Sequence, residues 1–242
     1  MLAIYKKEIF SFLSSLVAYI VMILFLTGIG LFMWIFPDTN ILDYGYADMD
    51  TLFMLSPYIF LFLIPAITMR TFAEERKTGT IELLLTRPLS DWQIIIGKYA
   101  ASFTLVVLAL LPTLLYYYSV YQLGAPVGNI DSAGTIGSYI GLLMLAATFT
   151  AIGIFASILS DNQIVSFIIA VFLCFFMYDG FGLLANVNDT SDIAYFISQL
   201  GIHHHYEATR KGLIDSRNVV YFLTLITLAL AATKMLLGSR KW

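Results

Sequence analysis

Six long apolar runs constrain this chain more than any other feature of its sequence. A helix needs about 20 largely apolar residues to cross roughly 30 Å of hydrocarbon, and backbone groups in lipid must be hydrogen-bonded within the segment itself. Hydrophobic residues make up 60% of the 242 and charged residues only 12%. The sequence therefore predicts an all-α integral membrane protein, a single six-span domain over residues 1–242. The expected spans are residues 14–36, 52–72, 98–121, 136–158, 163–185 and 219–237.

The distribution of basic residues predicts the orientation of these spans. Cytoplasmic loops of membrane proteins carry an excess of Lys and Arg. With the N-terminus inside, all but three of the 13 basic residues fall on the inner side, the exceptions being Arg210, Lys211 and Arg217. We expect a multi-pass protein of the bacterial inner membrane with both termini in the cytoplasm. The net charge of −3 gives no reason to expect a nucleic-acid partner.

The most charged stretch, residues 70–98, lies between the second and third spans. The second span should continue into the cytoplasm as far as Gly79. A short helix should follow, with Thr80 as its N-cap and Glu82 near its positive end, and Pro88 should end it. The apolar residues of this helix recur at helical spacing, as Ile81, Leu84 and Leu85. An ordinary solvated loop is the alternative.

The start of the third span carries its own signals. Ser90 is a good N-cap, and Gln93 three residues later completes a capping box, while Leu89 and Ile94 are placed as a hydrophobic staple. Together these features predict a short, rigid helix that lies across the membrane surface with one apolar face. A rigid element of this kind can pass force from a soluble partner to a membrane helix.

The same stretch, PAITMRTFAEERKTGTIELLLTRPLSDWQIIIGKY, resembles the cytoplasmic signature of type-2 ABC transporter permeases. The matching residues are Glu74, Glu75, Arg76, Gly79, Thr80, Leu83, Leu84, Leu85, Pro88, Gly97 and Lys98. The six-span pattern agrees with that family, and the later segment HHHYEATRKGLIDSRNVVYFL resembles it as well. The nearest resemblance is to the permease subunits of the gliding-motility-associated ABC transporters of Bacteroidetes.

The resemblance implies a function. Residues Gly79–Leu85 would form a coupling helix docked on a separate cytoplasmic ABC ATPase, which would bind ATP and Mg²⁺ while this chain binds no cofactor. A second permease half, identical or not, would complete one export pathway that serves gliding motility. The residues expected at the ATPase contact are Glu74, Glu75, Arg76, Gly79, Thr80, Glu82, Leu83, Leu84 and Pro88.

Polar residues inside or next to the spans are the other candidates. Asp179 is the one acid within a predicted span, and an intramembrane carboxylate is a functional candidate. Either it lines the pathway, or it lies in a solvated break at Gly180. The consecutive His203, His204 and His205 point in different directions on a helix or strand, which favours an outward polar patch over a metal site. Cys174 is alone, so we predict neither a disulfide nor a metal centre.

Other segments of the chain carry further predictions. Residues 1–13 form either an interfacial helix on the inner leaflet or an extension of the first span. An outer amphipathic helix is expected before the last span, capped by Asp189 or Ser191. Its apolar residues are Ile193, Phe196, Ile197 and Leu200. The fourth span carries small residues that favour close packing, within the chain or between chains. They are Gly137, Gly141, Gly153 and Ser157. Pro65 and Pro112 should kink the second and third spans.

Missing motifs narrow the function further. The sequence has no G-x-x-x-x-G-K-[ST] phosphate-binding loop, and Trp92 stands where the first glycine before Gly97 and Lys98 should be. We therefore expect no ATP hydrolysis by this chain. Two rival functions stay open: a structural membrane anchor for a motility or secretion complex, and an intramembrane lipid-modifying enzyme. The aromatic, uncharged spans weakly favour an amphipathic or lipid-linked cargo.

Overall fold

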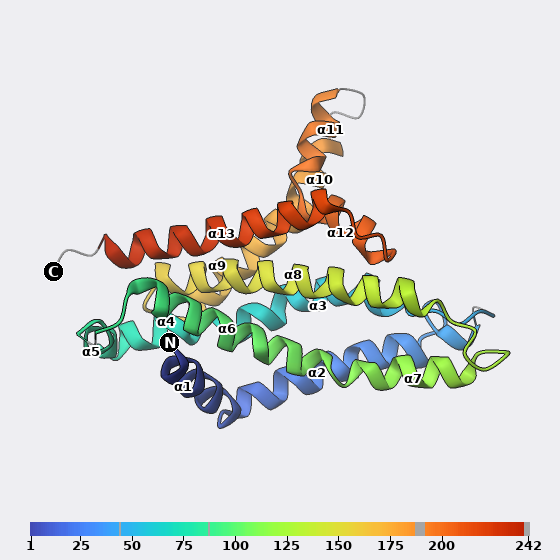
Figure 1. The fold of residues 1–242 in the computed structure, drawn as a ribbon, viewed down its shortest axis with the longest axis horizontal. Helices are drawn as coiled ribbons and strands as arrows, with labels where there is room; N and C mark the ends of the chain where they lie inside the picture. The colour runs from blue at the N-terminus through green and yellow to red at the C-terminus, as the bar shows by residue number, and fades with distance from the viewer. Residues whose placement is uncertain (44, 87, 187–191, 240–242) are drawn as a thin grey trace.

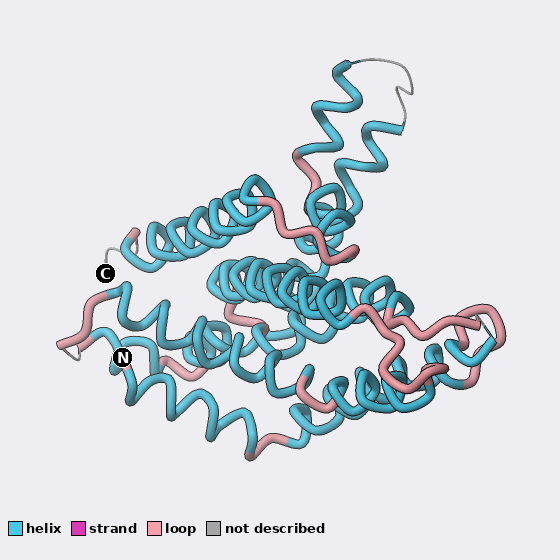
Figure 2. The backbone as a smooth tube through the Cα atoms, turned by 45° about the vertical axis from the view of Figure 1, so that its right-hand side comes forward, coloured by secondary structure: helices cyan, strands magenta, loops and turns pink. Residues whose placement is uncertain are grey.

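The computed structural model describes residues 1–43, 45–86, 88–186 and 192–239, and this part of the chain contains helices and loops but no strand (Figure 2). Six helical segments in it are long and apolar enough to cross a membrane, which confirms the all-α, six-span prediction. They are Leu16–Trp34, Asp50–Lys77, Asp91–Leu123, Ser132–Leu159, Gln163–Ala185 and Ser216–Gly238. The third begins at Asp91 rather than at the predicted residue 98.

Several of these segments consist of more than one helix (Figure 1). The first half of the chain contains α1 (Leu2–Leu13), α2 (Leu16–Trp34), the 3₁₀ turn η1 (Ile41–Asp43), α3 (Asp50–Thr68), α4 (Arg70–Lys77), α5 (Thr80–Leu85), α6 (Asp91–Leu110) and α7 (Thr113–Leu123). The second half contains α8 (Ser132–Leu159), α9 (Gln163–Phe175), the π-helix η2 (Phe176–Gly180), α10 (Phe181–Asn186), α11 (Asp192–Gln199), α12 (Ile202–Arg210) and α13 (Ser216–Gly238).

The N-terminal helix α1 is separate from the first span. A turn at Ser14 and Ser15 divides α1 from α2, and α1 packs along α6 (Figure 1). Ile4 and Phe12 are buried, whereas Leu2, Lys6 and Phe10 are exposed on the opposite face. Because the turn separates α1 from α2, the alternative of a simple extension of the first span is wrong.

Helix α8 is the centre of the bundle and contacts α3, α4, α6, α9, α12 and α13. Its glycines allow these neighbours to approach. A Cβ atom would collide with Thr68 of α3 at Gly153, with Thr209 of α12 at Gly141, and with the backbone of Gly212 at Gly137. The line of small residues predicted from the sequence is therefore used for packing within the chain.

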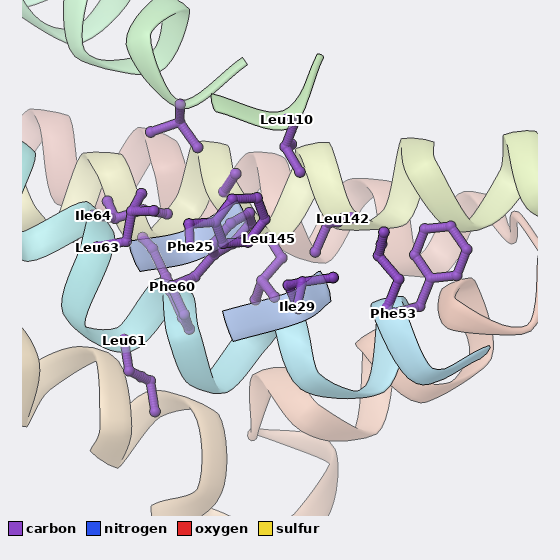
Figure 3. Packing of buried hydrophobic residues seen from close by; sticks show 14 of the residues in the cluster. Phe25, Ile29, Phe53, Phe60, Leu61, Leu63, Ile64, Leu110, Leu142 and Leu145 are labelled. Atoms are coloured by element: carbon purple, nitrogen blue, oxygen red, sulfur yellow. The ribbon is translucent and has the colours of Figure 1, made fainter. Parts of the chain in front are cut away.

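The main core lies where α2, α3 and α8 meet. Figure 3 shows its aromatic and aliphatic side chains interleaved between these helices, and Leu110 of α6 approaches from one side. Phe25 and Phe60, whose ring centroids are 5.6 Å apart, join α2 to α3. On α8, Leu142 and Leu145 are fully buried against them. The side chains of this core are thereby removed from lipid.

The two prolines expected to kink spans behave differently. Pro112 lies in the turn between α6 and α7, so the third span is interrupted there as predicted. Pro65 lies inside α3, which continues to Thr68. Gly153 of α8 packs against Thr68 at the end of α3, next to the junction with α4.

The fifth span leaves the bundle near its end. Helix α9 continues through the π-helix η2 into α10, so the break predicted at Gly180 is wrong. Helices α10 and α11 contact each other and project away from the other spans (Figure 1). The helix α11 confirms the short outer helix expected from the sequence. Its proposed caps, Asp189 and Ser191, lie outside the described residues.

The helix α12 was not predicted. It lies against α8, and its C-terminal end is fixed to α3 by two contacts. The Tyr206 hydroxyl donates to the Phe53 carbonyl at 2.7 Å, and the Arg210 guanidinium lies 3.4 Å from the Asp50 carboxylate. A second ion pair, to Glu207, holds Arg210 within α12. These contacts fix the polar segment before the last span onto the bundle.

Candidate functional site

The charged stretch between the second and third spans forms a helical hairpin of α4 and α5 at one end of the bundle (Figure 1). Gly79 makes the turn with φ of 70°, a left-handed conformation that glycine adopts without strain. Gly79 itself is the N-cap position, and Thr80 is the first helical residue. The predicted cap at Thr80 is therefore wrong. Its hydroxyl instead lies 2.9 Å from that of Thr78.

The helix α5 has the amphipathic character expected of it. Ile81 is buried in a second apolar cluster with Phe72 and Ile94, and Leu84 packs against the same cluster. Glu82 is exposed on the other side. The helix ends at Leu85, three residues before Pro88, and the side chains of Leu83 and Leu85 lie outside the described part. The apolar face thus anchors α5 to α4 and α6, which leaves its polar face available to a partner.

The start of α6 confirms the capping box. The Gln93 N–H donates to the Ser90 hydroxyl at 3.4 Å, and the Ser90 N–H donates to the Gln93 side-chain oxygen at 3.2 Å. Ile94 is buried in the second cluster and Leu89 packs against it, as the staple predicts. This cap fixes the register of α6 and brings Lys98, two turns later, to face α1 and α4.

Lys98 is the centre of a buried ion cluster. Its side chain has no exposure to solvent, and its ammonium group lies 2.9 Å from a carboxylate oxygen of Glu75 and 2.9 Å from one of Glu8. It also donates to the Thr71 carbonyl at 2.6 Å. A buried charge is tolerated only when it is paired and hydrogen-bonded, and these three partners meet that need. The cluster joins α6 to α1 and α4.

Lys7 closes the cluster from the side of α1. Its ammonium group donates to the second carboxylate oxygen of Glu75 at 2.6 Å. Partial burial acts to lower the pKa of Lys7, but the hydrogen bond and charge of Glu75, with the charge of Glu8, outweigh burial and raise the pKa above its usual value. Two lysines and two glutamates therefore compensate one another across three helices.

The other side of α4 is attached to the end of α8. The Arg76 guanidinium donates to the Ile158 carbonyl at 2.8 Å. The Ser157 hydroxyl accepts from the Phe72 N–H at 2.9 Å and donates to the Met69 carbonyl at 3.1 Å. These bonds satisfy backbone groups at the junction of α3 and α4, where the regular helical ladder is interrupted. Helix α4 is thus held from two sides.

The residues predicted to contact an ATPase divide into two groups. Glu75 and Arg76 point into the protein and hold α4 in place. The exposed ones lie on the hairpin and just after it, and are Glu74, Gly79, Thr80, Glu82 and Pro88. Sequence reasoning missed Lys7 and Glu8 as members of this site. The only signal for them was the charged face of residues 6–8 within an apolar N-terminal segment.

Asp179 occupies a separate place, on the π-helix between α9 and α10. It is half-buried and interacts electrostatically with His203 of α12. The His203 ring meets the neighbouring Tyr178 ring edge-on, with centroids 5.3 Å apart. π-helical turns occur frequently at functional sites.

The three histidines have different environments on α12. His203 and His204 are exposed, and partial burial together with His205 and His203 lowers the pKa of His204. His205 bonds to the Asn218 side-chain oxygen at 2.8 Å and to the Gln199 carbonyl at 2.9 Å, and it stacks on Tyr221. Within the described residues, no group of His, Cys, Asp or Glu could hold a metal ion. His205 therefore has a structural role between α11 and α13.

The sequence of the chain matches a known transporter family. The family model described as ABC-2 family transporter protein matches residues 37–201, which is more than half of the chain. The chain belongs to the ABC-2 transporter family. The match covers the α4–α5 hairpin, Lys98 and Asp179, but not α1 with its Lys7 and Glu8. A comparison with curated proteins gives no match.

Membership of the ABC-2 family, together with the six apolar helical segments, identifies a multi-pass membrane component of an ABC transporter. Such components take part in transport and are not themselves catalytic. The family works with an ABC ATPase at a membrane. The family therefore places this fold among transport proteins. The exposed residues of the α4–α5 hairpin are candidates for contact with a soluble partner.

Proposed function

We propose that this chain is the permease half of an exporter-type ABC transporter, and that a separate cytoplasmic ATPase drives it through the α4–α5 hairpin. One observation carries the proposal: the exposed hairpin is joined to α1 and α6 by the ion cluster of Lys7, Glu8, Glu75 and the buried Lys98. A surface element that is fixed to two other helices transmits a displacement, whereas a flexible loop absorbs it. The residues that would contact the ATPase are the exposed Glu74, Gly79, Thr80, Glu82 and Pro88.

The mechanism follows from these attachments. The ATPase would bind ATP with Mg²⁺, dimerise and press on α5. Because Ile81 anchors α5 in the apolar cluster with Phe72 and Ile94, the push would reach α4. The pair of Glu75 with Lys98 would then carry it to α6, so the second and third spans would tilt together. This change would switch access to the pathway from one side of the membrane to the other.

A second permease half, identical or different, would complete the pathway. Helices α2, α9 and α13 have the least buried span surfaces and could meet lipid or that second half. The start of α1 and the end of α13 lie at the same end of the bundle as α5 (Figure 1), which is the side predicted from the sequence to carry most basic residues. These features support a bacterial inner-membrane protein with cytoplasmic termini. The resemblance to gliding-motility permeases supports cell movement as the process that it serves.

Isolation of the complex tests the proposal. The tagged chain, extracted from its native membranes in mild detergent, should co-purify with a protein that hydrolyses ATP, and the permease should stimulate that hydrolysis. Glu82→Lys should weaken the association because it reverses the exposed charge on α5. Asp161→Lys, an exposed charge reversal in the turn between α8 and α9, is the matched control. Isolation without any ATPase would contradict the proposal and favour a structural membrane anchor.

A further inference from the structure

A half-open cavity of about 400 Å³ lies between α1, α4 and α6, beside the buried ion cluster. Its lining changes along the helices. At the end near the α4–α5 turn the lining is polar, with Glu74, Thr78 and Thr80. At the other end it is mainly apolar, with Phe12, Ile67, Ala101 and Leu105 beside the hydroxyl of Ser102. At about 1.5 Å per residue, Ile67 and Thr78 are separated by roughly 16 Å.

We propose that this cavity binds one phospholipid of the inner leaflet whose headgroup carries both a phosphate and an amine. A lipid molecule has the same gradient as the cavity, with a charged head next to a hydrocarbon chain. The head would lie among the polar groups near the hairpin, and part of one chain would cover Phe12, Ile67 and Leu105. The inference goes beyond the proposed function, since lipid would bind whether or not an ATPase is present.

The cations of the cavity suit the phosphate. The Arg70 guanidinium donates to the Ser15 hydroxyl and to the Ser11 carbonyl, each at 3.1 Å, and lies 5.1 Å from the centre of the Phe12 ring. These contacts hold the group in place and use two of its five donors. Charge-assisted bonds from arginine to phosphate are among the strong hydrogen bonds of proteins. Lys7 also lines the cavity and adds a second positive charge.

The acidic residues that line the cavity favour a lipid headgroup that carries an amine. Glu8, Glu74 and Glu75 all line it, so Lys7 and Arg70 do not make it a net basic site. Glu8 and Glu75 are paired with Lys98. Among the residues that the structure describes, Glu74 forms no ion pair, and its carboxylate is exposed where the headgroup amine would lie. A purely anionic headgroup would leave the Glu74 carboxylate without a cation, whereas a zwitterion supplies a negative group for Arg70 and a positive group for Glu74.

Competition between two lipids tests the headgroup. The purified chain in detergent is mixed with equal amounts of phosphatidylethanolamine and phosphatidylglycerol with the same acyl chains, and retained lipid is measured by native mass spectrometry. We expect several-fold enrichment of phosphatidylethanolamine. Glu74→Gln should abolish this preference, and Glu82→Gln, an exposed acid outside the cavity, should keep it. Equal retention of the two lipids by the unmodified chain, or an unchanged preference in Glu74→Gln, would overturn the proposal.

Chemical blocking after folding tests the location. In a Cys174→Ala background, Ser11→Cys places an exposed thiol at the cavity, and Ser14→Cys places one a turn away and outside it. A bulky maleimide on position 11 should reduce retained phosphatidylethanolamine several-fold, and the same label on position 14 should not. Equal retention with both labels would show that the lipid binds elsewhere. Because the label is added to the folded protein, a folding defect cannot produce the expected difference.

Discussion

The ammonium group of Lys98 lies 2.9 Å from the carboxylate of Glu75, at a point where the Lys98 side chain has no contact with solvent. Lys98 belongs to the third membrane span, and Glu75 belongs to α4, the last part of the second span and the first helix of the hairpin. The pair therefore makes the position of the hairpin dependent on the position of α6. Removal of either charge would leave the other buried without its main partner, which makes the pair a sensitive point of the fold.

The first prediction concerns this pair. Lys98→Met should lower the free energy of unfolding by about 3–5 kcal/mol, because it leaves the buried carboxylates of Glu75 and Glu8 without their shared cation. Thermal unfolding in detergent, followed by the amount of monodisperse protein, measures the change. Lys98→Met with Glu75→Gln should recover part of the loss. The control is Lys211→Met at an exposed site, and equal stability of the Lys98 and Lys211 variants would contradict the prediction.

The second prediction concerns the turn at Gly79. Its φ of 70° is incompatible with proline, which is fixed near −65°. Gly79→Pro should displace α5 and reduce permease-stimulated ATP hydrolysis to the basal rate of the ATPase, while the amount of chain in the membrane stays the same. Gly182→Ala is the matched control, since a Cβ atom there meets nothing within 4 Å. Full stimulation by the Gly79 variant would exclude the hairpin as the coupling element.

The third prediction concerns orientation. In a Cys174→Ala background, an impermeant maleimide applied to intact cells should label Lys211→Cys and should not label Lys77→Cys. Both positions are exposed on the protein, so the difference reports the side of the membrane. Permeabilised cells supply the control, because both positions should then react. Labelling of position 77 in intact cells would refute the cytoplasmic placement of the hairpin.

The fourth prediction concerns Asp179. If this residue lines the pathway, Asp179→Asn should reduce the transporter's function in cells several-fold without lowering chain abundance or ATPase binding. Asparagine keeps the size and hydrogen-bonding capacity of the side chain, so the loss of charge alone is tested. Asp161→Asn, an exposed acid in the turn between α8 and α9, should have no effect. Unchanged function in the Asp179 variant would remove it from the pathway.

Local patterns in the sequence predicted local structure well. The capping box of Ser90 and Gln93 and the apolar spacing of α5 depend on neighbours within one turn, and both are confirmed. The capping box predicted the helix start at Ser90, whereas the apolar part of the third span was predicted to begin only at residue 98. Lys98 lies inside α6 because two carboxylates neutralise it, and Glu8 is 90 residues away along the chain. A hydropathy profile averages over neighbouring residues, so it cannot detect an ion pair between residues that are far apart in the sequence.

The polar segment before the last span shows the same limit. Residues 202–210 have little apolar periodicity, and so α12 was not expected. It is stabilised by contacts to distant helices, such as the hydrogen bond of Tyr206 to Phe53, which are 153 positions apart. The role of His205 in stacking on Tyr221 could not be predicted, because it requires the packing of α12 on α13.

The π-helix at residues 176–180 amounts to one additional residue within an otherwise α-helical segment. Each residue of an α-helix advances the direction of its side chain by about 100°. Deletion of a single residue there would therefore rotate everything beyond it by about that angle, including the projecting α10. The direction in which the α10–α11 arm projects is thus determined by the number of residues at this one point of the chain, and related chains could redirect the arm through a one-residue insertion or deletion.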